Sequence, residues 1–120
     1  MEQLKKFMEP KYITFEQAKW LYRIGYEFDT EEDFTDWDEE KFNDLITSPE
    51  QHQVVDWLLE KHGIWVHSTP ENNEEDIVKW CYTIQSIDTE VRFIRRFGEF
   101  NSPQEAYSAA FDYLISQNII

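Results

Sequence analysis

The fold is decided by an alternating stretch, DIVKWCYTIQS, at residues 76–86. Successive residues of a β-strand point to opposite faces of a sheet, so a period of two predicts a half-buried strand. One row of this stretch is large and apolar, and the other is mostly polar. The apolar row consists of Val78, Trp80, Tyr82 and Ile84. The other row consists of Lys79, Cys81, Thr83 and Gln85. We therefore expect the first row to pack against a core.

Two further strands are predicted on either side of this stretch. Residues 64–67 (IWVH) form a short strand, and residues 68–75, rich in Asn, Pro and Glu, form a loop. Residues 90–100 form the third strand, in which Arg95 breaks the alternation and indicates a bulge near it. Short connections between strands favour an antiparallel meander.

Three helices are predicted from their capping signals. These signals are Thr14 with Gln17, Ser48 with Pro49 and Gln51, and Ser102 with Pro103 and Glu105. Gly25 and Gly63 follow the first two helices, where a left-handed residue often ends a helix.

Two of these helices carry an apolar stripe at helical spacing. The stripe of the second helix is Val54, Val55, Leu58, Leu59 and His62. The stripe of the third helix is Ala106, Ala109, Ala110, Tyr113 and Leu114. We expect both to pack on the apolar row of the central strand. The sequence thus predicts a single α+β domain over residues 1–120. It has a three-stranded antiparallel sheet with amphipathic helices on one face, in the order helix-helix-β-β-β-helix.

An acidic aromatic insert at residues 27–46 carries most of the charge. The chain has a formal net charge of −14, and residues 26–50 hold eleven acids against one base, Lys41. Large apolar residues recur within the insert, which disordered segments seldom contain, and residues 38–46 are compatible with a short helix. The predicted partner surface consists of Glu31, Glu32, Asp36, Trp37 and Glu39.

A second candidate surface is the open face of the sheet. Trp65, Lys79, Arg92 and Arg96 combine aromatic and cationic side chains that could stack on bases or bind protein. The alternative, which we prefer, is that these cations form cross-strand salt bridges with Asp76 and Glu90.

Several classes of function are disfavoured by the composition. A strongly acidic chain is repelled by phosphate backbones, so neither nucleic acid nor an anionic membrane is expected as a direct partner. The lone cysteine, Cys81, and the absence of a signal peptide or membrane span favour a cytoplasmic protein. No nucleophile elbow or phosphate loop is present, and His52, His62 and His67 lack metal-ligand spacing. We expect no enzyme activity, no cofactor and no metal.

Three stretches resemble a family of small uncharacterised proteins of tailed phages and prophages, often from gut Bacteroidetes. They are ITFEQAK at residues 13–19, DWLLEKHGI at residues 56–64 and FNSPQEA at residues 100–106. The resemblance implies a viral origin and a bacterial intracellular setting, without an activity. Together with the charge pattern, it favours a protein-binding module or inhibitor that acts on a host or phage protein. The alternatives are a structural homo-oligomer and an acidic DNA mimic that occupies a host nucleic-acid-binding or defence protein.

The acidic segment resembles a calcium-binding loop in its spacing, but we predict that it does not bind calcium. Asp29, Glu31, Asp33 and Glu40 occupy positions 1, 3, 5 and 12 of an EF-hand frame, but Phe34 replaces the glycine that its turn requires. Calorimetric titration should therefore show no calcium binding tighter than about millimolar, the weak end of natural sites. A micromolar isotherm that Glu40→Gln abolishes would contradict this.

Overall fold

A three-stranded antiparallel sheet and four helices make up the part of the chain that the structure describes, residues 12–72, 78–86 and 93–117 of this computed structural model. The elements are α2 (Phe15–Arg23), α3 (Glu39–Leu45), α4 (Gln51–His62), β1 (Ile64–Asn72), β2 (Val78–Ser86), β3 (Phe93–Phe100) and α5 (Pro103–Ser116). The predicted α+β class is confirmed. The short helix expected in the acidic insert is present as α3, so three helices precede the sheet.

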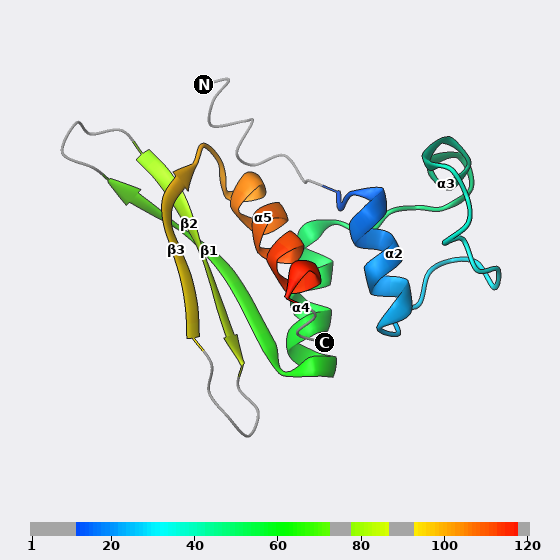
Figure 1. Ribbon diagram of the computed structural model, residues 1–120, viewed down its shortest axis with the longest axis horizontal. Helices are drawn as coiled ribbons and strands as arrows, with labels where there is room; N and C mark the ends of the chain where they lie inside the picture. The colour runs from blue at the N-terminus through cyan, green and yellow to red at the C-terminus, as the bar shows by residue number, and fades with distance from the viewer. Residues whose placement is uncertain (1–11, 73–77, 87–92, 118–120) are drawn as a thin grey trace.

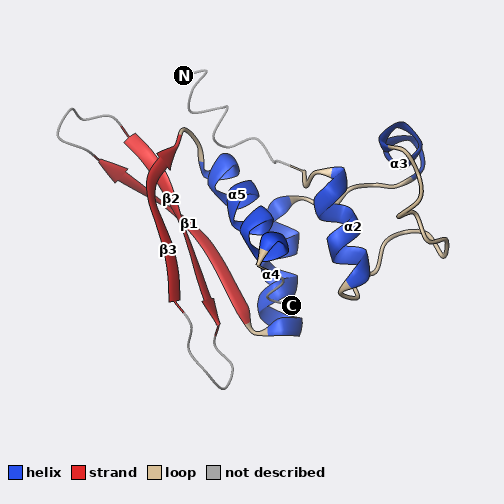
Figure 2. Ribbon diagram, viewed as in Figure 1, coloured by secondary structure: helices blue, strands red, loops and turns tan. Residues whose placement is uncertain are grey.

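The elements are stacked in layers behind the sheet (Figures 1 and 2). Helices α4 and α5 cover one face of the sheet, and α2 lies on the far side of α5. The acidic segment with α3 is the layer farthest from the sheet. The core runs through these layers, and its fully buried members include Leu21, Phe34, Phe42, Val54, Leu58, Val66, Phe111 and Leu114.

The register of the sheet places the predicted apolar row under the helices. Ile84 of β2 pairs with Val66 of β1 and with Ile94 of β3, and both Tyr82 and Ile84 are buried. The pairing shifts between Trp80, opposite Phe100, and Tyr82, opposite Arg96. The irregularity therefore lies between Arg96 and Phe100, after the predicted position at Arg95, which pairs regularly with Thr83.

The caps of α2 and α5 are formed by the residues that the sequence indicates. The Thr14 hydroxyl accepts from the Gln17 N–H at 3.1 Å, and the Gln17 side chain accepts from the Thr14 N–H at 3.0 Å. Ser102 accepts from the Glu105 N–H at 3.1 Å. A capping box also requires the Glu105 carboxylate to accept from the Ser102 N–H. It accepts instead from the N–H of Asn101, so this second bond of the predicted capping box at α5 is wrong.

The predicted start of α4 is wrong by two residues. Its N-cap is Glu50 rather than Ser48, and Pro49 precedes the helix. The cause lies far away in the sequence, because the Ile13 N–H donates to the Pro49 carbonyl and Tyr12 pairs with Glu50. This short ladder keeps the backbone extended up to Glu50.

The loop predicted at residues 68–75 is wrong where the structure describes it, because β1 continues to Asn72. Thr69 pairs with Cys81, and their side-chain oxygen and sulfur atoms are 2.9 Å apart. Pro70 is tolerated because β1 is an edge strand, where a missing N–H does not interrupt the ladder.

The helix stripe on α4 is narrower than predicted. Val54 and Leu58 are fully buried, whereas Leu59 is 37% exposed. Two turns before Leu58 and on the same helix face, Gln51 is buried and its side-chain amide donates to the Gln104 carbonyl of α5 at 3.0 Å. A buried glutamine thus extends the buried face formed by Val54 and Leu58.

We predict that Leu58→Ala lowers the free energy of unfolding by about 2–5 kcal/mol, because it removes a fully buried side chain and leaves a cavity. The matched control is Leu59→Ala, the same change one residue later at a partly exposed position, which should cost less than about 1 kcal/mol. Denaturant titration of both variants measures the difference. Equal losses would show that the buried face is wrongly assigned.

A second buried glutamine attaches α2 to α5. The Gln17 side-chain amide is fully buried and its Nε2 lies 3.0 Å from the Ser108 hydroxyl and 3.0 Å from an Asp112 carboxylate oxygen. The Ser108 carbonyl is a further acceptor at 3.2 Å. The same side chain therefore caps its own helix and fixes that helix to the last one.

We predict that Gln17→Ala costs about 1–3 kcal/mol of unfolding free energy, because the fully buried amide and its hydrogen bonds to Thr14, Ser108 and Asp112 are lost. Gln53→Ala is the control. Gln53 holds the equivalent capping position of α4, where its Oε1 accepts from the Glu50 N–H, but it is exposed and makes no link to another helix. Thermal unfolding should separate the two variants, and a larger loss at Gln53 would contradict the assignment.

Candidate functional site

The acidic segment, residues 27–46, is held by hydrogen bonds within its own sequence. Asp33 accepts from the hydroxyl of Thr35 at 2.6 Å and from its N–H at 2.9 Å, and these bonds lower the pKa of this exposed carboxyl. Thr30 accepts from the Glu32 N–H, and Asp38 caps α3. Side chains that bond to nearby backbone are typical of ordered turns, so the segment has a defined path.

A connected row of aromatic rings fixes this path to the core. Phe34 and Phe42 are buried, with ring centroids 5.0 Å apart. Phe28 contacts Phe34 at 4.8 Å in an edge-to-face arrangement, and Phe42 contacts Phe15 of α2 at 5.0 Å. Such pairs contribute about 0.5–1.5 kcal/mol each beyond their area burial. The rings therefore hold the segment against α2.

The acids of the segment all point to solvent. Residues 27–44 contain ten of them, and every one is exposed: Glu27, Asp29, Glu31, Glu32, Asp33, Asp36, Asp38, Glu39, Glu40 and Asp44. Within the described part of the chain, none of these carboxylates belongs to an ion pair. Buried rings on one side and unpaired charge on the other give this layer a strongly negative outer surface.

The predicted partner surface is only partly accessible. Glu31, Glu32, Asp36 and Glu39 are exposed as a binding surface requires. Trp37 is half-buried, contacts Phe34 at 6.2 Å, and has the Lys41 ammonium 4.4 Å from its ring centroid. Trp37 thus already has a cation over its ring, and the accessible part of this surface is its carboxylates.

Trp65 and Lys79, the members of the predicted open sheet face whose side chains the structure describes, lie far apart along the sheet. Trp65 is 42% exposed and stacks on His67 at 4.5 Å. Lys79 lies six residues along β2 from Gln85, the partner of Trp65, or about 20 Å at the rise of a strand. The Lys79 ammonium donates to Asn101.

The two arginines proposed for that face stay a prediction. The backbone of Arg96 pairs with that of Tyr82. Arg92 lies outside the described residues, as do Asp76 and Glu90, the salt-bridge partners expected in the alternative.

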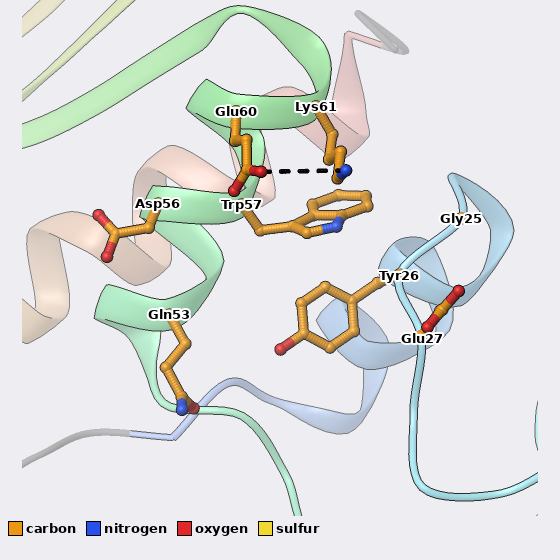
Figure 3. A pocket seen from close by; sticks show the side chains of 8 residues that line it. All are labelled: Gly25, Tyr26, Glu27, Gln53, Asp56, Trp57, Glu60 and Lys61. Carbon is orange, nitrogen blue, oxygen red and sulfur yellow. Dashed lines mark ion pairs between the residues drawn. The ribbon is translucent and has the colours of Figure 1, made fainter.

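A cleft that the sequence analysis missed lies between the end of α2 and helix α4 (Figure 3). Its volume is about 570 Å³, and its lining is Gly25, Tyr26, Glu27, Gln53, Asp56, Trp57, Glu60 and Lys61. The helix residues at 53, 56, 57 and 60 follow the spacing of a single helix face. That spacing was the available signal, but the matching loop residues are about thirty positions earlier in the chain.

The end of α2 sets the position of the loop side of this cleft. Gly25 has a positive φ of 105° and its N–H donates to Tyr22, while the Tyr26 N–H donates to Leu21 at 2.9 Å. This pair of bonds is the Schellman motif that ends many helices. It directs Tyr26 toward α4, where its ring meets Trp57 edge-on with centroids 5.1 Å apart.

The cleft combines aromatic walls with a negative charge. Its lining holds three carboxylates, all exposed, and one ammonium, that of Lys61. Partial burial raises the pKa of Tyr26, so the phenol stays neutral over the physiological range. Figure 3 shows the two rings at the centre, Glu60 and Lys61 beside the indole, and Asp56 directed away from the ring pair.

Among the described residues, no group of three or more His, Cys, Asp or Glu side chains is arranged to hold a metal ion. No described helix is long and apolar enough to cross a membrane. Cys81 is buried and its thiol lies within hydrogen-bonding distance of Thr69, an arrangement of a packed thiol rather than an accessible nucleophile.

Comparisons with protein-family models, with curated proteins and with solved structures find no match to this chain. The resemblance to small phage and prophage proteins therefore stays a prediction.

Proposed function

We propose that this chain is a non-enzymatic protein-binding module of phage type that acts in the bacterial cytoplasm. Its partner would be a basic protein of the host or the phage, and binding would inhibit or redirect that protein. The surface that we assign to this role is the acidic layer formed by residues 27–44.

One observation carries the proposal, namely that all ten acids of this layer are exposed while the rings behind them are buried. Ten acids and one base within eighteen residues repel one another, and this repulsion destabilises the compact state. An aromatic scaffold that holds the carboxylates in place against this repulsion favours a role for the charge itself. A solubilising surface needs neither a fixed backbone nor so high a charge density.

The charge also favours a different protein, rather than a second copy, as the partner. Two copies with a net charge of −14 each repel one another, most strongly through their acidic layers. A basic surface is instead attracted from a distance and associates faster. A DNA mimic that occupies a nucleic-acid-binding protein is one form of this proposal, because such proteins present basic surfaces.

The test is to neutralise four exposed acids of the layer, Glu31, Glu32, Asp36 and Glu39, to Gln or Asn. We expect unchanged or slightly higher stability, because repulsion is relieved. Association with a partner isolated from host lysate should slow by about tenfold or more at low salt, since charge steering is worth 10–10³ in rate. Stopped-flow kinetics at two ionic strengths measure both the rate and its salt dependence.

A charge-preserving variant is the matched control. Exchanging Glu for Asp and Asp for Glu at the same four positions alters side-chain length but not charge, so the association rate should stay near that of the natural chain. Equal rates for the neutralised variant and the natural chain would refute the binding role and leave a solubilising surface as the better account.

A further inference from the structure

We infer that the cleft between residues 25–27 and α4 binds the cationic side chain of a lysine or arginine of the partner protein. This inference rests on the proposed function and deepens it, because it names the chemical group that is recognised at short range. The acidic layer attracts a basic partner, and the cleft holds one of its side chains.

The aromatic walls suit a cation with an apolar stem. Tyr26 and Trp57 are both half-buried and meet at 67°, so they form two walls at a steep angle to each other. A lysine or arginine contributes a hydrocarbon stem to pack on such rings and a charged end attracted by their faces, and tryptophan attracts cations best. The cleft volume, about 570 Å³, lies within the range of small-ligand sites.

The carboxylates beside these rings are available for a ligand. Glu27 is in no ion pair with another described residue, and Glu60 has only Lys61, with a nitrogen-oxygen distance of 4.0 Å. Both members of that pair are largely exposed, at 74% and 59%, and an exposed pair at this distance contributes little. A ligand cation can therefore replace Lys61 beside Glu60.

Other ligands fit this lining less well. An anion would be repelled by Glu27, Asp56 and Glu60, which outnumber the single ammonium. A metal ion needs several carboxylates converging on one point, and no such group exists among the described residues. A neutral apolar ligand would leave the carboxylates unused.

The experiment uses peptides as probes and needs no isolated partner. Short capped peptides of glycine with a central lysine, arginine or acetyl-lysine are titrated into the full chain, and heteronuclear NMR spectra are recorded. We expect saturable shifts at the Trp57 indole N–H and at the amides of residues 25–27 with the lysine and arginine peptides. Acetyl-lysine has nearly the same shape without the charge, so its peptide should give no saturable shift.

Three charge variants of α4 sharpen the test. Glu60→Gln should weaken lysine-peptide binding by about two- to fivefold, the range of an exposed ion pair. Asp56→Asn removes the same charge from a side chain that points away from the rings, so its effect should stay below about twofold. Lys61→Gln should strengthen binding by about twofold, because it removes the competing cation.

A change of the ring itself tests the aromatic contribution. Trp57→Phe keeps an aromatic wall but weakens its attraction for a cation, so the lysine-peptide affinity should fall by about threefold. The unchanged melting temperature of each charge variant serves as the folding control. If Trp57→Phe unfolds the chain, the three charge variants alone decide.

Two results would overturn the inference: equal shifts with the acetyl-lysine peptide, or no shift at residues 25–27 and Trp57. A rank order in which Asp56→Asn weakens binding more than Glu60→Gln would also overturn it. These outcomes are distinct from failure of the proposed function. That function is tested by the association rate of the variant neutralised at Glu31, Glu32, Asp36 and Glu39. A partner that binds by the acidic layer with unaltered affinity for the Glu60→Gln variant would leave the proposed function standing without the cleft.

Discussion

The side-chain amide of Gln17 is the contact on which the arrangement of the outer layers depends. It is fully buried, caps α2 by accepting from the Thr14 N–H, and donates to Ser108 and Asp112 of α5. Helix α5 in turn lies on the sheet, so this one side chain fixes the position of α2 relative to the strands. A buried amide that loses its partners is costly, so the orientation of α2 is well specified.

The placement of the acidic segment and of the cleft follows from the position of α2. Its first turn carries Phe15, which contacts Phe42 and so orients the acidic segment. Its last turn ends in the Gly25 motif, which directs Tyr26 onto Trp57 and so forms the cleft. Both the acidic layer and the cleft are therefore attached to the sheet through the same helix. A disturbance at Gln17 would alter them together, although it lies in neither.

The sequence predicted those features that neighbouring residues determine, and failed where distant residues intervene. The caps at Thr14 and Ser102 need only side chains three residues away, and both were found. The start of α4 depends on the pairing of Tyr12 with Glu50, and no local pattern reports that pairing. The exposed acids could be predicted because ten carboxylates cannot be buried together. The cleft could not, because its two sides meet only after α2 has packed against the rest of the fold.

The acidic layer and the cleft would act on different stages of one binding event. Attraction between the layer and a basic partner extends over about a Debye length, roughly 8–10 Å at physiological salt, and so acts before contact. The cleft acts only after contact, on a side chain that packs against Tyr26 and Trp57. Mutations that remove charges spread over a surface mainly lower the association rate, whereas mutations of a direct contact mainly raise the dissociation rate. Because Glu27 begins the acidic layer and also lines the cleft, the two stages join at one residue, and a cation drawn to the layer arrives at the edge of the site that would hold it.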